Sequence, residues 1–166
     1  MEKKAETLFK KYKTKYVAKL GRHALDNFEI DTLANTLFGT KYKGSFAVND
    51  KFQLKAGYYI INNDVKSGAG IHWIAMVLTA KKAYIYDSVA RDSNKLVSHL
   101  VKKLKLAKYT IINSDRKDKE QKETEIICGH LSISFLSVVK ELGIKASIKY
   151  NKEIEMNYVL SKKSLK

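Results

Sequence analysis

A long apolar segment beside the single cysteine of the chain constrains the fold more than any other feature. Cys128 and Gly129 open this run within the segment 121–142. Its apolar positions are Leu131, Ile133, Phe135, Leu136, Val138, Val139 and Leu142. Their helical spacing predicts a helix over about 129–142, buried on most of its surface, and Gly143 is well placed to end it. The rest of the domain must therefore pack around this helix.

Cys128 would lie at the N-terminus of that helix. Unpaired backbone N–H groups and the helix dipole favour a thiolate over a thiol at such a position. A lone cysteine is nevertheless more often a small, buried and inert hydrophobic residue. A nucleophilic cysteine also needs a basic partner and an exposed position, so other segments must supply that partner.

The length and composition predict one globular domain over 1–166. The chain has 166 residues, and 45% of them are hydrophobic, which is enough for one substantial core. No apolar run reaches the roughly 20 residues of a transmembrane helix, and the N-terminal segment carries charges throughout instead of the apolar core of a secretory signal. One cysteine cannot form an intramolecular disulfide. We therefore expect an intracellular protein in a reducing compartment, without membrane contact.

The charge balance is strongly basic. Lysine and arginine number 32 against 17 acidic residues, which gives a formal net charge of +15. Such a surplus attracts nucleic acid or an acidic surface through long-range, salt-sensitive forces. Solubility alone is an equally simple explanation, and the lysines are spread along the chain rather than interleaved with aromatic residues that could stack on bases. Nucleic-acid contact is therefore one of two interpretations of the charge.

Further helices are predicted on either side of a group of strands. They are expected over about 4–20 as a basic amphipathic helix, from a cap at Asp31 to Gly39, from a cap at Ser93 to about Leu104, and from a cap at Asn151 as a short final helix. These helices would pack on a central sheet, which predicts a single compact domain of the α+β class.

β-Branched and aromatic residues predict the strands of that sheet. In the segment 71–80, alternation places His72, Ile74, Met76 and Leu78 on one face and Trp73, Ala75 and Val77 on the other. A turn then leads into 83–88, so these two strands are expected to form an antiparallel hairpin. The other expected strands lie at 42–50, 57–61, 109–113 and, as an edge strand, 145–150, with loops at 62–70 and 114–125.

The best candidate for a catalytic base is His72. Of the four histidines, it opens an apolar strand, and Asp87 ends the neighbouring strand. The hairpin places both side chains at the same end of the sheet, where the carboxylate can orient the imidazole and stabilise its charged form. His130 follows Cys128 too closely on the helix to face its sulfur. Either His72 or Asp87 could instead be an ordinary polar residue at a strand end or turn.

An acyl-transfer site also needs donors for the oxyanion that develops on the scissile carbonyl. The backbone N–H of Cys128, at the start of the helix, is one candidate. Gln121 lies seven residues upstream in the charged loop and offers a side-chain amide as the second. A glutamine in such a loop is uninformative by itself.

Taken together and in this order, these residues resemble a known family. The set His72-Trp73, Asp87-Ser88, Gln121 and Cys128-Gly129 is similar to the adenovirus-type (adenain-like) cysteine proteases, and closest to the maturation proteases of Polinton/Maverick elements and virophages. The likeness extends from about 57 to 142. SUMO-deconjugating proteases share the order of residues, but their glutamine usually lies nearer the cysteine.

The resemblance implies a papain-like cysteine protease architecture, with the catalytic cysteine at a helix N-terminus. It implies Cys128, His72 and Asp87 as a triad, Gln121 in the oxyanion hole, and Trp73 and Gly129 as binding residues beside them. The expected activity is endopeptidase cleavage of capsid or core precursor proteins during virion maturation, near glycine or other small residues. Such an enzyme would work in the virion and in the cytoplasm or nucleus of the host cell.

The resemblance further implies that no metal or other cofactor is required. Activation by DNA or by a non-covalently bound peptide is expected, with viral DNA contacting the lysine-rich surface. An activating peptide held by a disulfide is ruled out, because the chain has no second cysteine.

Two other functions fit parts of the same pattern. One is a deubiquitinase or SUMO-deconjugating isopeptidase that acts on host proteins, which would prefer ubiquitin- or SUMO-fused reporters. The other is a basic nucleic-acid-binding protein without enzymatic activity, which would show salt-sensitive DNA binding and an unreactive thiol.

Overall fold

The protein has an α+β fold built on a mixed five-stranded sheet. The computed structural model of the chain describes residues 2–63, 72–88, 97–113 and 126–150. Its elements are α1 (Glu2–Leu20), α2 (Asn27–Phe38), a short 3-10 helix η1 (Gly39–Lys41), β1 (Tyr42–Ala47), β2 (Gly57–Asn62), β3 (Trp73–Leu78), β4 (Lys82–Tyr86), α4 (Ser98–Leu106), β5 (Thr110–Asn113) and α5 (Cys128–Tyr150). No helix in these described stretches is long and apolar enough to cross a membrane.

The strands follow one another across the sheet in chain order, β1-β2-β3-β4-β5. The central three are antiparallel, whereas β1 runs parallel to β2 and β5 runs parallel to β4. The predicted hairpin of β3 and β4 is confirmed, with Ala75 opposite Tyr86 and Leu78 opposite Ala83. The start of β3 and the end of β4 therefore lie at one end of the sheet.

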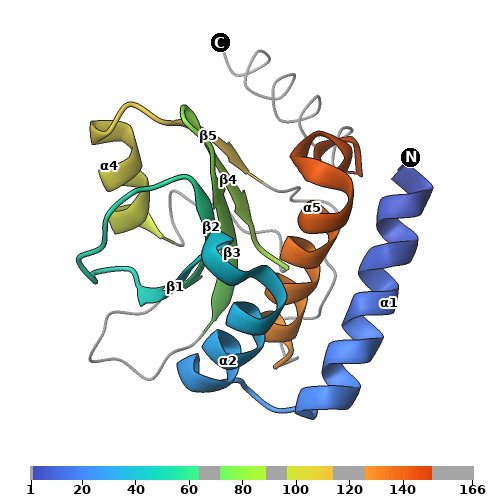
Figure 1. The fold of residues 1–166 in the computed structure, drawn as a ribbon. Coiled ribbons are helices and arrows are strands. Elements are labelled where there is room, and N and C mark those ends of the chain that lie inside the picture. The colour runs from blue at the N-terminus through green and yellow to red at the C-terminus, as the bar shows by residue number, and fades with distance from the viewer. Residues whose placement is uncertain (1, 64–71, 89–96, 114–125, 151–166) are drawn as a thin grey trace, which may run out of the picture.

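Helices cover both faces of the sheet, and α5 is the central helix on one of these faces (Figure 1). As predicted, Trp73, Ala75 and Val77 share one face of β3, and they belong to the core cluster with α5, α1 and α2. The alternate residues of β3, which are Ile74, Met76 and Leu78, belong to the opposite cluster with α4. The ring of Tyr86 stacks on that of Phe135 at 4.5 Å between centroids, which fixes α5 against β4.

The helix that follows Cys128 is confirmed, and Gly143 interrupts it with a non-helical backbone (φ 80°, ψ 163°). The predicted edge strand at 145–150 is wrong, because the chain after Gly143 returns to helix and continues to Tyr150. That segment is short, and its alternation of apolar and polar residues is too brief to separate strand from helix.

The predicted cap of α2 is also wrong. The helix begins five residues earlier, after Asp26, whose carboxylate accepts from the Glu29 N–H at 2.8 Å while Glu29 accepts from the Asp26 N–H at 3.3 Å. This reciprocal pair is a capping box, and its Asp-x-x-Glu spacing outcompetes a lone acidic residue. Asp31 lies inside the helix and accepts a 2.6 Å hydrogen bond from the Tyr42 hydroxyl.

α1 matches the predicted N-terminal helix, whereas α4 begins later than predicted. The amphipathic basic helix is confirmed as α1, which buries Ala5, Phe9 and Tyr16 and contacts α5 through a 2.7 Å hydrogen bond between Tyr16 and Ser137.

α4 begins at Ser98 after a non-helical Val97, so it does not extend back to a cap at Ser93. Ser93 itself, the loop with Gln121 and the helix expected from Asn151 lie outside the described residues.

Candidate active site

Three chain segments bring His72, Asp87 and Cys128 to one end of the sheet. His72 immediately precedes β3, Asp87 immediately follows β4, and Cys128 is the first residue of α5. The antiparallel hairpin brings the first two together, because the start of one strand lies beside the end of the other. The N-terminus of α5 packs across the same end of the sheet (Figure 1).

The imidazole of His72 is bonded to the carboxylate of Asp87. The Nε2 atom lies 2.5 Å from Oδ1 of Asp87, and both residues are almost fully buried, at 4% and 3% exposure. The main-chain oxygen of His72 accepts from the Asn63 N–H at 2.9 Å, so the backbone that carries the ring is held by β2. Since Nε2 is occupied by the carboxylate, Nδ1 is the ring nitrogen that remains for the cysteine.

Cys128 lies in surroundings that favour its thiolate. Its sulfur accepts a 3.4 Å hydrogen bond from the backbone N–H of Trp73, and the residue is 7% exposed. Burial raises the pKa of the thiol, but hydrogen bonds from His72, Trp73 and Gly129 and the charge of His72 outweigh burial, so the pKa is lowered. The negative charge is thus stabilised by a helix N-terminus, a neighbouring backbone amide and an imidazolium together.

The opposite shift occurs at the imidazole. Burial lowers the pKa of His72, but hydrogen bonds to Asp87 and Cys128 and the charges of both partners outweigh it, so the pKa is raised. A raised histidine pKa beside a lowered cysteine pKa brings the two pKa values closer and favours a thiolate–imidazolium pair. Such a pair can attack an electrophilic carbonyl and return a proton to the leaving group.

Trp73 and Gly129 hold the surroundings of the cysteine in place. The indole Nε1 of Trp73 donates to the main-chain oxygen of Leu25 at 2.8 Å, which fixes the connection between α1 and α2. Gly129 lies against Leu25 and Ile30, and a Cβ at that position would come within 3.1 Å of the Leu25 side chain. A larger residue would therefore push this connection away from the start of α5.

The other described histidines are not partners of Cys128. His130 turns away from the sulfur as predicted, and its Nε2 bonds the main-chain oxygen of Gly21 at 2.7 Å. Burial lowers the pKa of His130, so it stays neutral at physiological pH. His23 pairs with Glu29 at 2.8 Å on the surface, and His99 is exposed on α4.

The backbone N–H of Trp73 is a functional group that the sequence analysis missed. Main-chain donors leave no signal in residue identity, and only the packing of α5 on β3 brings this one to the sulfur. The predicted second oxyanion donor, Gln121, lies outside the described residues, so the described part of the site offers the Cys128 N–H for that role. No group of three or more metal-binding side chains comes together within the described parts of the chain.

Comparisons with protein-family models and with curated proteins found no match for this chain.

Proposed function

We propose that this protein is a cysteine endopeptidase of the adenovirus type, with a papain-like architecture. The observation that carries the proposal is the arrangement of His72, which bonds Asp87 through one ring nitrogen and acts on the pKa of Cys128. A nucleophile, a base and a residue that orients the base are the minimum set for thiol-dependent acyl transfer. Cys128 is buried and not exposed as expected for a nucleophile, but its position at a helix start beside the His72–Asp87 pair supports a catalytic role over an inert one.

The proposed reaction proceeds through an acyl-enzyme. The Cys128 thiolate attacks the scissile carbonyl carbon, and the resulting oxyanion is bound by the Cys128 N–H and by Gln121. The His72 imidazolium then gives its proton to the leaving amine, and the C–N bond breaks. Water, deprotonated by His72, attacks the thioester and releases the carboxylic acid and the free thiolate. Asp87 holds the ring orientation throughout.

The substrates we propose are capsid or core precursor proteins, cut near glycine or other small residues inside the virion or the infected cell. The main alternative, a deubiquitinase or SUMO-deconjugating isopeptidase, uses the same chemistry and differs only in substrate. A direct comparison of a precursor protein with ubiquitin- and SUMO-fused reporters separates the two. Faster cleavage of the modifier fusions would favour the isopeptidase.

The first test is the reactivity of the thiol itself. We expect iodoacetamide to label Cys128 rapidly well below pH 8 in the wild type, and about tenfold more slowly at pH 6 in His72→Ala. Without the imidazolium, burial raises the thiol pKa with less opposition, so less thiolate is present at low pH. His99→Ala removes an exposed histidine and should leave the labelling profile unchanged. An ordinary thiol profile in the wild type, with or without added DNA, would contradict the proposal.

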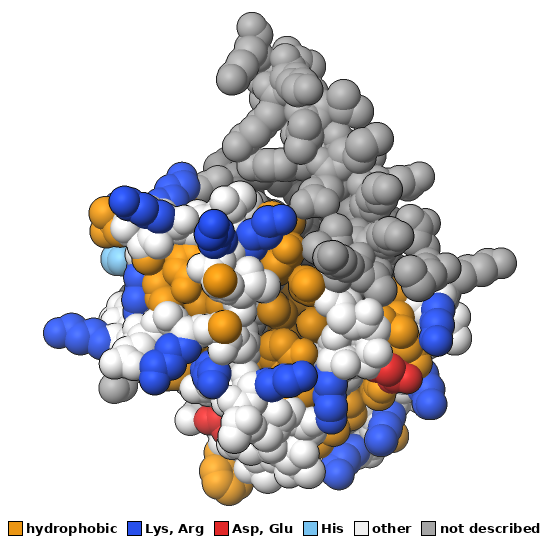
Figure 2. Space-filling view, turned by 45° about the horizontal axis from the view of Figure 1, so that its top comes forward, with side chains coloured by type: hydrophobic (Ala, Val, Ile, Leu, Met, Phe, Trp, Pro, Cys, Tyr) orange, Lys and Arg blue, Asp and Glu red, His pale blue; other side chains and the backbone are white. Residues whose placement is uncertain are grey.

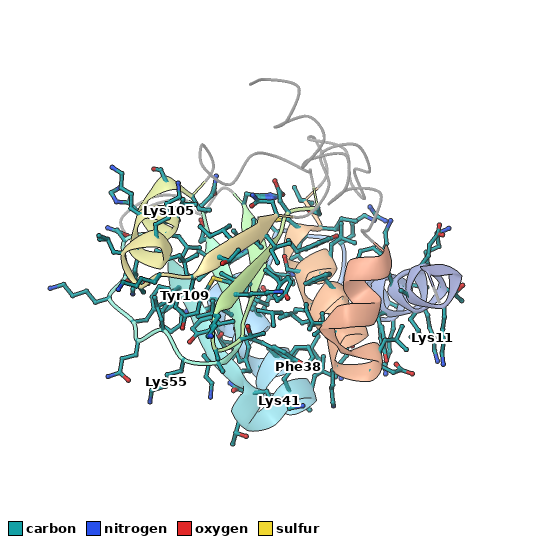
Figure 3. All side chains as sticks on the ribbon, turned by 90° about the horizontal axis from the view of Figure 1, so that it is seen from above. Lys11, Phe38, Lys41, Lys55, Lys105 and Tyr109 are labelled. Carbon is teal, nitrogen blue, oxygen red and sulfur yellow. The ribbon has the colours of Figure 1, made fainter. Side chains whose placement is uncertain are left out.

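DNA is the activator that we propose, and it would bind at the end of the sheet opposite the catalytic residues. Lysines from four segments meet there, because β1, β2, β4 and β5 all start at this end. These residues, which we call the basic end, are Lys41, Lys43, Lys55, Lys81, Lys82, Lys105 and Lys108, and all are exposed. Figure 2 shows lysine and arginine around hydrophobic side chains on this side of the molecule, and Figure 3 labels Lys41, Lys55 and Lys105.

Local contacts hold parts of the basic end together. The Thr110 N–H donates to the main-chain oxygen of Lys81 at 2.9 Å, which joins the β3–β4 turn to the start of β5. The side chain of Lys43 lies against Gly57 and donates to the Thr40 oxygen at 2.9 Å. A clustered positive surface of this kind suits the closely spaced phosphates of a nucleic acid.

Charge reversal at this surface should weaken DNA binding and reduce its salt dependence. For Lys81→Glu/Lys82→Glu, we expect the slope of log K against log salt to fall in magnitude by about 2, because two phosphate contacts are lost. Fluorescence anisotropy with a short duplex over a range of salt concentrations measures the slope. Lys15→Glu/Lys19→Glu makes the same charge change on α1 and should have the smaller effect. An equal loss of DNA affinity in both double variants would argue against the basic end as a defined DNA-binding surface.

A further inference from the structure

The backbone of Trp73 contacts the first two turns of α5 at two points. Its N–H donates to the sulfur of Cys128 at 3.4 Å, and its carbonyl oxygen accepts from the hydroxyl of Ser132 at 3.3 Å. Ser132 lies about one helical turn after Cys128, so both side chains project from the same side of the helix. α5 therefore holds Trp73 of β3 through both of its backbone groups, the N–H donor and the carbonyl acceptor.

Among the residues that the structure describes, neither of these two backbone groups has a strand partner. The His72 carbonyl accepts from the Asn63 N–H, so the backbone of His72 points toward β2. Hydrogen-bonding direction alternates along an antiparallel strand, and the groups of Trp73 therefore point to the opposite side, toward β4. The pairing of β3 with β4 begins only at Ala75 opposite Tyr86. Side chains of α5 supply the partners that the sheet does not.

We propose that Ser132 is a positioning residue, whose hydroxyl orients the Trp73 backbone so that its N–H points at the sulfur of Cys128. This role rests on the proposed function, and Ser132 would act on Cys128 only through the backbone of Trp73. Ser132 is fully buried (0% exposed), and the Trp73 carbonyl would lose this donor if the hydroxyl were removed. A buried carbonyl without a donor is costly, so the backbone at Trp73 would shift to find a new one.

The effect of Ser132 on the thiol must pass through this backbone. Among the described titratable side chains, His72 acts on Cys128 directly and Asp87 acts through His72. Ser132 carries no charge and does not touch either of them in any described contact. A change in the pH dependence of the thiol after removal of the Ser132 hydroxyl would therefore report the orientation of the Trp73 N–H.

The test is the rate of iodoacetamide labelling of the full chain as a function of pH, in Ser132→Ala. We expect labelling below pH 7 to slow about three- to tenfold, the size typical of losing one ordinary hydrogen bond. The rate at high pH should be unchanged, because the thiol is fully ionised there. Loosened packing alone would instead change accessibility, and hence the high-pH rate.

The matched control is Ser134→Ala. Ser134 lies on the same helix, is equally buried at 0% exposure, and donates to the His130 oxygen of its own helix at 2.8 Å. Its loss should leave the labelling profile within about twofold of the wild type. An unchanged profile in Ser132→Ala, an equal shift in both variants, or a change confined to the high-pH rate would each overturn the proposal.

An isosteric pair covers the case in which Ser132→Ala does not fold. Ser132→Thr keeps a hydroxyl and Ser132→Val has the same shape without one, so Thr should retain the wild-type profile and Val should lose it. Identical profiles in the two variants would overturn the role of Ser132. A wild-type thiol that reacts only as an ordinary cysteine would instead contradict the proposed function itself, so the two failures are distinguishable.

Discussion

Cys128→Ala should abolish peptide hydrolysis, with kcat/KM at least about 10⁴-fold below that of the wild type. The sulfur lies where a helix N-terminus, the Trp73 N–H and His72 act on it together. Without it no acyl-enzyme can form, and the imidazole alone can at best direct water at a carbonyl. The measurement is steady-state cleavage of a precursor-derived peptide.

The variant should still fold and bind substrate. Alanine removes one buried atom and, with it, the weak acceptor of the Trp73 N–H, whereas the contacts of Trp73 with Leu25 and Ser132 remain. We therefore expect a melting temperature close to that of the wild type and a measurable peptide dissociation constant. Ser134→Ala, a comparable truncation further along α5, should keep full activity. Wild-type turnover in Cys128→Ala would eliminate this residue as the nucleophile.

Local patterns predicted the part of the site that strands position. The apolar, β-forming run over 71–80 and the short turn before 83–88 are enough to predict an antiparallel hairpin. Antiparallel pairing then brings His72 and Asp87 to the same end of the sheet, independently of the other elements. The apolar run after Cys128 predicted a buried helix in the same way. These features depend on contacts between segments that are close in sequence.

The features that the sequence did not predict depend on competition between two candidate helix caps or on contacts between segments far apart in the chain. Asp26 and Asp31 both resemble helix caps, and the reciprocal contact with Glu29 decides between them. The segment 145–150 has weak preferences and follows the helix beyond Gly143. The Trp73 N–H could not be predicted as a thiolate donor, because its direction follows from the register of β2, β3 and β4 and its partner comes from α5, 55 residues further along the chain.

Asp87→Asn should lower kcat by about 10²–10⁴-fold, the range in which positioned general acid–base catalysis contributes. The carboxylate accepts from Nε2 of His72 at 2.5 Å, which directs Nδ1 to the cysteine. An asparagine can present its amide NH₂ to that nitrogen instead, which favours the wrong tautomer. Asp31→Asn is the control and should leave kcat unchanged, since the Asp31 carboxylate also accepts a hydrogen bond, in a partly buried position away from the site.

The pH profile of kcat/KM should narrow from both sides in Asp87→Asn. Asp87 raises the pKa of His72, so its loss lowers that pKa, and the alkaline limb, where the imidazolium loses its proton, moves to lower pH. A less stable imidazolium also stabilises the thiolate less, so the thiol pKa rises and the acid limb moves to higher pH. A profile that keeps its width while activity falls would mean that Asp87 supports the fold at this end of the sheet and does not tune the catalytic pair.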